Sequence, residues 1–249
     1  MSELVSIITP TYNASEFIKS TLDSIINQSY LNWELLVTDD CSSDSTWQIL
    51  NEYSKKDKRI KCYRLKENAG AAVARNNSLS NANGRFIAFC DCDDVWSLEK
   101  LTKQVDFMKK HDAPISFTAY GVCSEDLLTE DYEIRTPISI DYNGYLKNTI
   151  IGMSTSMIDL NIVEPFEFYN IRTRQDTYLW ISLLKRGHLA YGLNEKLVKY
   201  RIRNNSISAN KFKAAKRVWF LYYELEKLGL FKSLYYFSCY AKNALKKRL

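Results

Sequence analysis

The first hundred residues alternate short strand-like runs with segments of helical periodicity, and this alternation constrains the fold more than any other feature. Strand character covers residues 5–9, 33–38, 60–65 and 85–90, and helical spacing fills the segments between them. Strands and helices joined by short links predict an α/β fold with a Rossmann-like, mostly parallel sheet covered by helices on both faces.

The remainder of the body continues the pattern less regularly. Asn13 and Glu16 fit a capping box for the first helix. Residues 125–142 lack periodicity and are expected to form a loop that can include an edge strand. The other expected elements are a helix over 98–111, strands at 115–119 and 154–158, a helix over 176–185 and a strand at 197–202.

The charge is unevenly distributed along the chain. Residues 211–249 carry ten Lys and Arg against two Glu, whereas the preceding residues carry 24 basic and 27 acidic side chains. We therefore expect residues 1–210 to form the α/β domain and residues 211–249 an amphipathic helical tail broken near Gly229. Interleaved basic and aromatic residues suit an anionic membrane surface, with a helix pair packed on the body as the alternative. No nucleic-acid recognition motif accompanies the charge, so nucleic acid is not an expected partner.

Cysteine usage and the N-terminal residues indicate the cellular compartment in which the protein is expected. The 6 cysteines are scattered and there are only 2 histidines, so a zinc site is not expected. The start Met-Ser-Glu lacks the features of a signal peptide, and no apolar stretch approaches the length of a bilayer span. A cytoplasmic protein with reduced thiols, peripheral on the inner face of the cytoplasmic membrane, is the resulting expectation.

Polar and acidic residues follow the predicted strands, where ligands bind in open α/β sheets. Asp91 and Asp93 share one side of an extended segment, and like charges this close favour a bound Mg²⁺ or Mn²⁺. A solvated turn that caps the next helix is the alternative. Asp40 either accepts a hydrogen bond from a nucleobase or belongs to a capping turn, and Tyr12 either stacks on that base or packs in the protein.

Several segments, taken together and in order, carry a family resemblance. They are Val5–Asn13, Asp39–Asp44, Asn68–Gly70, Ala74–Asn76, Asp91–Trp96, Lys100–Leu101, Gln175–Trp180 and Leu197–Ser208. This set resembles the family 2 glycosyltransferases with the GT-A fold, of the bacterial O-antigen and capsule type. The resemblance covers roughly residues 4 to 208.

The resemblance implies roles for individual residues. Asp40 would recognise uracil, Arg75 the phosphates, and Asp91 the ribose or donor sugar. The nucleotide-binding set is Pro10, Tyr12, Asn13, Asp40, Arg75, Asp91, Cys92 and Arg203, the metal ligand is Asp93, the general base is Asp176, and the candidate acceptor-side residues are Glu99, Thr155, Ser156 and Arg174.

Two positions depart from the family pattern. Gln175 stands where the family usually has Glu, and Arg203 replaces a usual His. Arg cannot ligate a metal but pairs with phosphate, so Arg203 is predicted to contact the diphosphate, with a surface Arg as the alternative. For Asp176, an ordinary helix N-cap is the alternative to the general base.

The resemblance implies an inverting, metal-dependent hexosyltransferase that uses Mn²⁺ or Mg²⁺. The donor would be a UDP-sugar of galactose or glucose, and the acceptor a HexNAc on a polyprenyl diphosphate, joined by a β-1,3 link. Two other functions stay open. A nucleotidyltransferase would need a Gly-rich loop with a basic residue near the N-terminus, where this chain has residues 10–13 (Pro-Thr-Tyr-Asn). A non-catalytic UDP-sugar-binding scaffold would not need the acidic residues.

Overall fold

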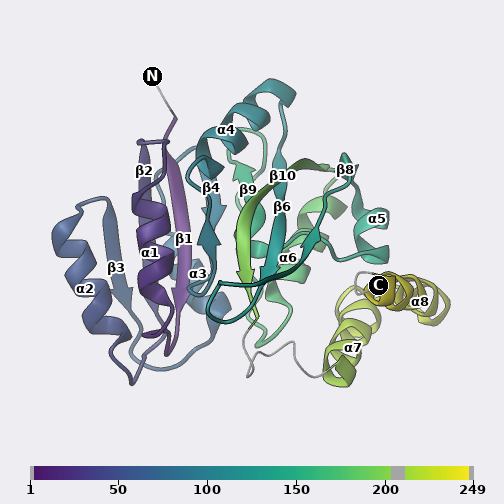
Figure 1. Cartoon of the computed structure of the whole chain (residues 1–249). Coiled ribbons are helices and arrows are strands. Elements are labelled where there is room, and N and C mark those ends of the chain that lie inside the picture. Colours follow the sequence, from purple (N-terminus) through teal and green to yellow (C-terminus); the bar gives the residue numbers. More distant parts are fainter. Residues whose placement is uncertain (1–2, 203–210, 247–249) are drawn as a thin grey trace.

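The computed structural model describes residues 3–202 and 211–246, which form a ten-stranded sheet with helices on both faces and a helical tail (Figure 1). The strands are β1 (Val5–Thr11), β2 (Trp33–Asp39), β3 (Ile60–Arg64), β4 (Phe86–Phe89), β5 (Val95–Trp96), β6 (Ile115–Cys123), β7 (Glu130–Ile134), β8 (Ser139–Ile140), β9 (Ser156–Asp159) and β10 (Ala190–Arg201). The helices are α1 (Ile18–Ile26), α2 (Thr46–Lys56), α3 (Ala71–Leu79), α4 (Lys100–His111), α5 (Tyr142–Lys147), η1 (Met153–Thr155), α6 (Gln175–Lys185), α7 (Lys211–Phe220), η2 (Leu221–Leu225) and α8 (Leu230–Lys246).

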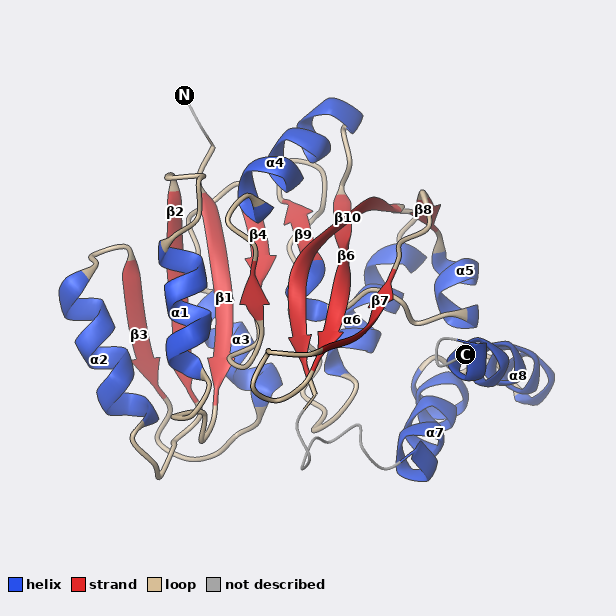
Figure 2. Ribbon diagram, viewed as in Figure 1, coloured by secondary structure: helices blue, strands red, loops and turns tan. Residues whose placement is uncertain are grey.

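The sheet is mostly parallel, as the alternation predicts. Its strand order is β3-β2-β1-β4-β9-β6-β10-β5, with β7 paired to β6 and β8 paired to β10. The neighbours β3, β2, β1 and β4 are all parallel, and so are β6 and β10. In contrast, β9 runs antiparallel between β4 and β6. The carboxyl ends of the parallel strands therefore meet along one edge, the lower edge in Figure 2.

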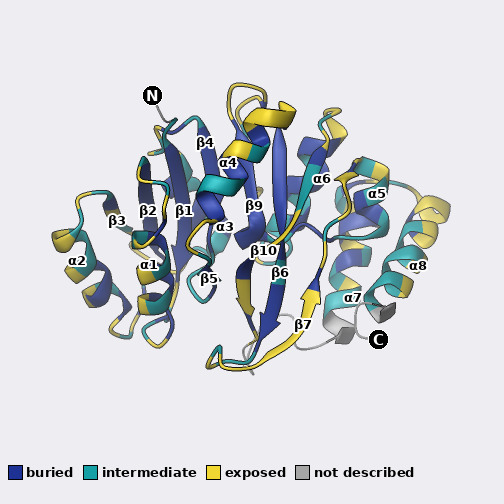
Figure 3. Cartoon of the chain, turned by 45° about the horizontal axis from the view of Figure 1, so that its top comes forward, coloured by how far each residue is buried: buried dark blue, intermediate teal, exposed yellow. Residues whose placement is uncertain are grey.

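Alternate side chains of each central strand enter different cores. In β1, Ile7 packs in the core under α1, α2 and α4, whereas Ile8 packs in the core under α3, α5 and α6. Both side chains are fully buried, and Figure 3 shows the central strands as buried throughout. A strand buried on both faces favours apolar residues, which the sequence has at residues 5–8 except for Ser6, whose buried hydroxyl donates to Glu34.

Two predicted strands extend further in the structure than in the sequence-based prediction. The strand predicted at 115–119 continues to Cys123, and the one predicted from Leu197 begins at Ala190. The first half of β10 includes polar, exposed residues and two register shifts against β6, which hide its strand character from a reading of periodicity. The region 125–142 contains the edge strands β7 and β8.

The predicted capping box at Asn13 is wrong. Helix α1 begins at Ile18 and has no side-chain hydrogen bond at its N-cap. Asn13 instead adopts a left-handed φ of 46°, and its side-chain oxygen accepts a hydrogen bond from the Ser43 backbone N–H at 2.9 Å. It thus ties the turn after β1 to the turn after β2.

The helical tail packs against the body through its inner face. Val218, Leu221 and Tyr222 are buried in the same core as α5 and α6. The Tyr222 hydroxyl donates to the Leu146 carbonyl at 2.6 Å, and Lys185 pairs with the buried Glu226. Gly229, with a φ of 77°, separates η2 from α8, where the break was predicted. Within the described ranges, no helix is sufficiently long and apolar to span a bilayer.

Lys100 is a fully buried cation at the start of α4. Its Nζ donates to Gln104 Oε1 at 2.7 Å and lies 4.1 Å from the centre of the Trp96 ring. Burial lowers the pKa of Lys100 to about 7. The folded chain therefore holds this proton much less tightly than the unfolded chain, in which a Lys has a pKa of about 10.4.

This difference predicts a pH dependence of stability. Between pH 7 and 10 the unfolded chain binds more protons at Lys100 than the folded chain, so the free energy of unfolding rises with pH, by up to about 1.4 kcal/mol per pH unit from this group. In Lys100→Met this rise is lost, as urea unfolding at pH 7, 8, 9 and 10 would show. The exposed Lys109→Met on the same helix keeps the wild-type slope. An unchanged slope in Lys100→Met would contradict the prediction.

Candidate active site

A cavity of about 730 Å³ opens at the carboxyl edge of the parallel strands. Its walls come from the turns after β1, β2, β3 and β4, from the segment before α6, from the end of β10 and from α7. The structure thus brings together residues that are far apart in the sequence. The predicted site residues that line the cavity are Pro10, Tyr12, Asp40, Arg75, Asp91, Cys92, Asp93, Arg174 and Asp176.

Asp40 organises one end of the cavity. Its buried carboxylate accepts hydrogen bonds from the backbone N–H groups of Ala69 and Gly70 at 2.7 and 2.8 Å, and from Asn68 Nδ2 at 3.0 Å. Gly70 has a φ of 97°, which favours glycine at the start of α3. Arg172 covers this turn, donating from Nη1 to Asn68 Oδ1 at 2.8 Å.

Arg75 and Asp91 form an ion pair in the middle of the cavity. Arg75 Nη2 lies 2.5 Å from Asp91 Oδ1, and the Arg75 side chain is only 6% exposed. Arg75 Nε and Nη1 are buried and have no hydrogen-bond partner among the residues that the structure describes. The guanidinium also faces the Phe168 ring at 5.4 Å. Arg75 therefore holds Asp91 with one nitrogen and keeps further donor capacity.

Asp94 fixes the turn after β4, which carries Asp91 and Asp93, through buried hydrogen bonds. Its buried carboxylate accepts hydrogen bonds from Ser154 Oγ and from the Arg201 backbone N–H, the latter at 3.1 Å. Ser154 Oγ in turn accepts from the Asp91 backbone N–H at 2.9 Å. Burial, followed by the neighbouring charges of Asp93 and Asp91, raises the pKa of Asp94 well above its ordinary range.

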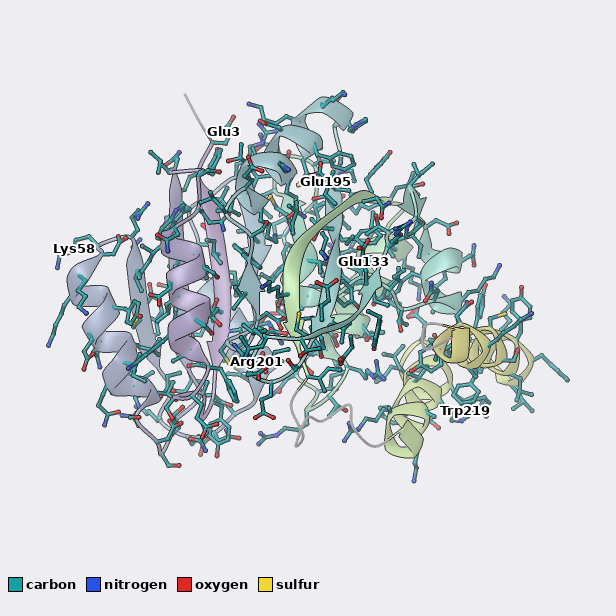
Figure 4. All side chains as sticks on the ribbon, in the orientation of Figure 1. Glu3, Lys58, Glu133, Glu195, Arg201 and Trp219 are labelled. Carbon is teal, nitrogen blue, oxygen red and sulfur yellow. The ribbon has the colours of Figure 1, made fainter. Side chains whose placement is uncertain are left out.

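Arg201, the last residue of β10, also binds the turn after β4. Its side chain is buried, Nε donates to the Asp93 carbonyl at 2.8 Å, Nη1 donates to the Glu125 carbonyl, and Nη2 lies 3.0 Å from Ser20 Oγ. Figure 4 shows Arg201 at the carboxyl edge of the sheet. The sequence alone indicates no role for Asp94, Ser154 or Arg201, although Arg201 stands inside one of the family-like segments.

The carboxylates fit a metal ion that also binds substrate. Among the described residues, no group of three or more His, Cys, Asp and Glu side chains could hold an ion. Asp93 lines the cavity, whereas Asp91 is paired with Arg75 and Asp94 is bonded beneath the turn. Mg²⁺ and ions like it commonly use one or two carboxylates together with phosphate oxygens. The donor set suits such an ion and does not suit a cage made of protein alone.

Asp176 lines the cavity from the first turn of α6. The helix begins at Gln175, after Arg174 with a φ of 64°, and no side chain caps it. The N-cap alternative for Asp176 is therefore wrong. The buried hydroxyl of Tyr145 lies near this carboxylate, because burial and then the Asp176 charge raise the pKa of Tyr145.

Several predicted residues lie away from the cavity lining. The hydroxyls of Thr155 and Ser156 are buried and each donates to a backbone carbonyl at 2.7 Å. Glu99 pairs with Lys103 at 3.1 Å at the start of α4. Asn13 joins two turns, as described above. Arg203 falls outside the described residues.

Comparison with known proteins agrees with this geometry. The model of the family described as Glycosyl transferase family 2 matches residues 6–171. The chain belongs to this family. TuaG of Bacillus subtilis (strain 168), whose name associates it with teichuronic acid biosynthesis, is 51% identical over 246 residues, covering 99% of this chain and 98% of TuaG.

Two Escherichia coli relatives have more specific names. WfgD, a UDP-Glc:alpha-D-GlcNAc-diphosphoundecaprenol beta-1,3-glucosyltransferase, is 41% identical, covering 87% of this chain and 84% of WfgD. WfaP has the same activity in its name and is 38% identical, covering 85% of this chain and 82% of WfaP. The chain is thus similar over most of its length to glycosyltransferases of bacterial polysaccharide synthesis.

Solved structures share the fold. The mannosyltransferase PcManGT of Pyrobaculum calidifontis, in complex with GDP-Man and Mn²⁺, superposes with a TM-score of 0.71 at 18% identity, covering 91% of this chain and 65% of that chain. S. aureus TarS 1-349 in complex with UDP-GlcNAc gives 0.69 at 19% identity, covering 90% of this chain and 67% of that chain. The GT-A fold, with its helical tail, is the fold that the sequence predicts.

The Asp40 contacts predict a local loss of structure on mutation. In Asp40→Asn one of the two acceptor oxygens is replaced by an NH2 donor, which faces the backbone N–H of either Ala69 or Gly70. We expect the free energy of unfolding to fall by about 1–3 kcal/mol and amide exchange at these two residues to accelerate. Urea unfolding and hydrogen exchange measure both effects. The exposed Asp106→Asn serves as control, and unaltered exchange at 69 and 70 in Asp40→Asn would argue against the assignment.

Proposed function

We propose that this glycosyltransferase is inverting and metal-dependent, and transfers a hexose from a UDP-sugar to a HexNAc on a polyprenyl diphosphate. The observation that carries the proposal is the single cavity in which Asp93 and Arg75, suited to a diphosphate, share the walls with Asp176. The names of WfgD and WfaP support glucose, a β-1,3 link and a lipid-diphosphate acceptor, with galactose as the other donor. The polymer is a surface polysaccharide.

The donor end of the cavity provides the groups for a uridine diphosphate. Tyr12 is 48% exposed at its rim and offers a ring face beside Pro10, and Asp40 lies below as an acceptor for the base. Arg75 has two unpartnered buried nitrogens for phosphate oxygens, and Asp91 and Cys92 lie beside it for the ribose. Charge-assisted hydrogen bonds of this kind are the stronger ones in proteins.

The reaction needs one base and no proton donor. Asp176 takes the proton from the attacking sugar hydroxyl while that oxygen bonds to the anomeric carbon and the bond to the UDP oxygen breaks, which inverts the configuration. Asp93, together with phosphate oxygens, would hold Mn²⁺ or Mg²⁺, which neutralises the negative charge that develops on UDP. Arg75 stabilises the same charge from its buried position.

The test of this function is transfer to a defined acceptor. UDP-Glc or UDP-Gal with a synthetic GlcNAc-α-diphosphate alkyl lipid should give a β-1,3-linked disaccharide, and chelation by EDTA should stop the reaction. Asp93→Ala should bind UDP in the presence of Mn²⁺ at least about tenfold more weakly by calorimetry, as the loss of a charged ligand implies. Asp106→Ala is the control. Full EDTA-resistant turnover would overturn the metal assignment.

Asp176→Asn tests the base directly. The amide keeps the shape of the side chain but cannot accept the proton, so kcat should fall by about 10²–10⁴-fold. The affinity for UDP and Mn²⁺ should stay at the wild-type value, because Asp176 is assigned to the acceptor hydroxyl and to neither the nucleotide nor the metal. Asp131→Asn, an exposed change in β7, should leave both quantities unaltered. A kcat within a factor of two of wild type in Asp176→Asn would exclude it as the base.

The outer face of the tail supports peripheral binding to an anionic membrane, on the inner face of the cytoplasmic membrane. Leu230, Phe231, Leu234 and Tyr235 form one exposed helical face at the start of α8, and Phe231 is 86% exposed. Lys232 lies within this stretch. Apolar side chains flanked by Lys are the pattern of an interfacial helix.

Vesicle sedimentation tests the membrane face. The double variant Phe231→Ser with Leu234→Ser should lose most of its binding to phosphatidylglycerol vesicles while its thermal unfolding is unchanged, because both side chains are solvent-exposed. The double variant Leu128→Ser with Ile138→Ser removes apolar side chains elsewhere that are at least as exposed, and it should sediment like wild type. Equal sedimentation of both double variants would refute the assignment.

A further inference from the structure

Helix α7 of the tail forms part of the cavity wall. Ala214 and Arg217 line the cavity together with Arg174 and Asp176 of the α6 segment. The tail therefore does more than pack on the body, since it supplies a guanidinium to the space where the reaction takes place. Figure 1 shows α7 beside the carboxyl edge of the sheet.

The arginines of the cavity fall into two sets by their contacts. Arg75 is paired with Asp91, and Arg172 is hydrogen-bonded to Asn68, so both belong to the nucleotide end. Arg174 and Arg217 come from the segments that carry Asp176 and the tail. These two guanidiniums line the same cavity as Asp176, and guanidinium groups suit an anionic ligand.

Arg174 is held at the junction between α6 and the tail. Its backbone is left-handed, with a φ of 64°, and its Nη2 lies 3.5 Å from the Tyr240 hydroxyl of α8. Arg174 therefore stands where the α6 segment meets the tail, and helix α7 of this tail contributes Arg217 to the same cavity.

We propose that Arg174 and Arg217 bind the diphosphate of the lipid-linked acceptor, and that the tail thereby completes the acceptor site. The inference rests on the proposed function. Arg pairs with phosphate oxygens bidentately, which Lys does not do. Arg174, Asp176 and Arg217 line one cavity, so we expect a sugar whose hydroxyl lies at Asp176 to present its anomeric diphosphate to the two guanidiniums.

The position of Arg217 also gives the lipid a route out of the cavity. Phe220 follows Arg217 by three residues, on the same side of α7, and is 50% exposed. Helix α8, which contacts α7, also carries exposed apolar residues. We therefore expect the lipid of an acceptor whose diphosphate binds Arg217 to run toward the tail.

Paired acceptors test the proposal on the full-length protein. One is GlcNAc-α-diphosphate carrying an undecyl chain, and the other is the neutral undecyl α-glycoside of GlcNAc. Wild type should use the diphosphate acceptor at least about tenfold better by kcat/KM. Arg174→Ala and Arg217→Ala should each raise KM for the diphosphate acceptor about 10–100-fold, the range for a hydrogen-bonded charge, and leave KM for the neutral acceptor and for the UDP-sugar unchanged.

Two further variants distinguish the loss of a phosphate contact from a general loss of activity or of positive charge. Arg217→Lys should recover only part of the affinity, because an ammonium cannot bind two oxygens in the planar arrangement of a guanidinium. Lys216→Ala removes the same charge from an exposed neighbour on α7 and should behave as wild type. Equal losses with both acceptors in Arg217→Ala, or no loss with either, would overturn the proposal.

Failure of this inference can be told apart from failure of the proposed function. If wild type transfers equally well to both acceptors, the function stands and the diphosphate site is wrong. If wild type transfers to neither, calorimetry with UDP, Mn²⁺ and the diphosphate acceptor still decides the site. Binding that Arg174→Ala and Arg217→Ala abolish would support the site, and binding that they leave intact would exclude it.

Discussion

The geometry of the cavity depends on one buried carboxylate. Asp94 accepts hydrogen bonds from Ser154 and from the backbone of Arg201, so it joins the turn after β4 to η1 and to the end of β10. Ser154 also binds the Asp91 backbone, and Arg201 also binds the Asp93 carbonyl. Asp91 and Asp93, which line the cavity, are therefore positioned by Asp94, which does not. A network of this kind is rigid because every buried polar group in it has a partner.

Polar side chains fix the other turns in the same way. Asp40 binds the backbone of residues 69 and 70, and Asn13 binds the turn after β2, so each polar side chain at the sheet edge fixes a neighbouring loop. Arg75 combines both tasks, since one nitrogen holds Asp91 while the others keep their donor capacity. Polar groups in this cavity are thus held in place by the protein itself, and such preorganisation lowers the cost of binding a ligand.

Much of this was predictable from the sequence, and the failures have physical causes. The largely apolar runs at residues 5–8 and 86–89 form the parallel strands, and the residues that follow them become the cavity. Ser154 and Arg201 are not found from the sequence because they bind backbone atoms 63 and 108 residues distant. The capping box failed at Asn13 because its side chain has a partner in another turn. Residues 190–196 do not look like a strand because residues 194–196 are exposed and the pairing with β6 is irregular.

The buried face of the tail has a practical consequence for protein production. Val218, Leu221 and Tyr222 fill the same core as α5 and α6, so shortening the chain before α7 would open that core to water. To obtain a more soluble sample for crystallisation, apolar side chains on the outward side of α8 should therefore be replaced by polar ones. The helix pair itself should be kept at its full length.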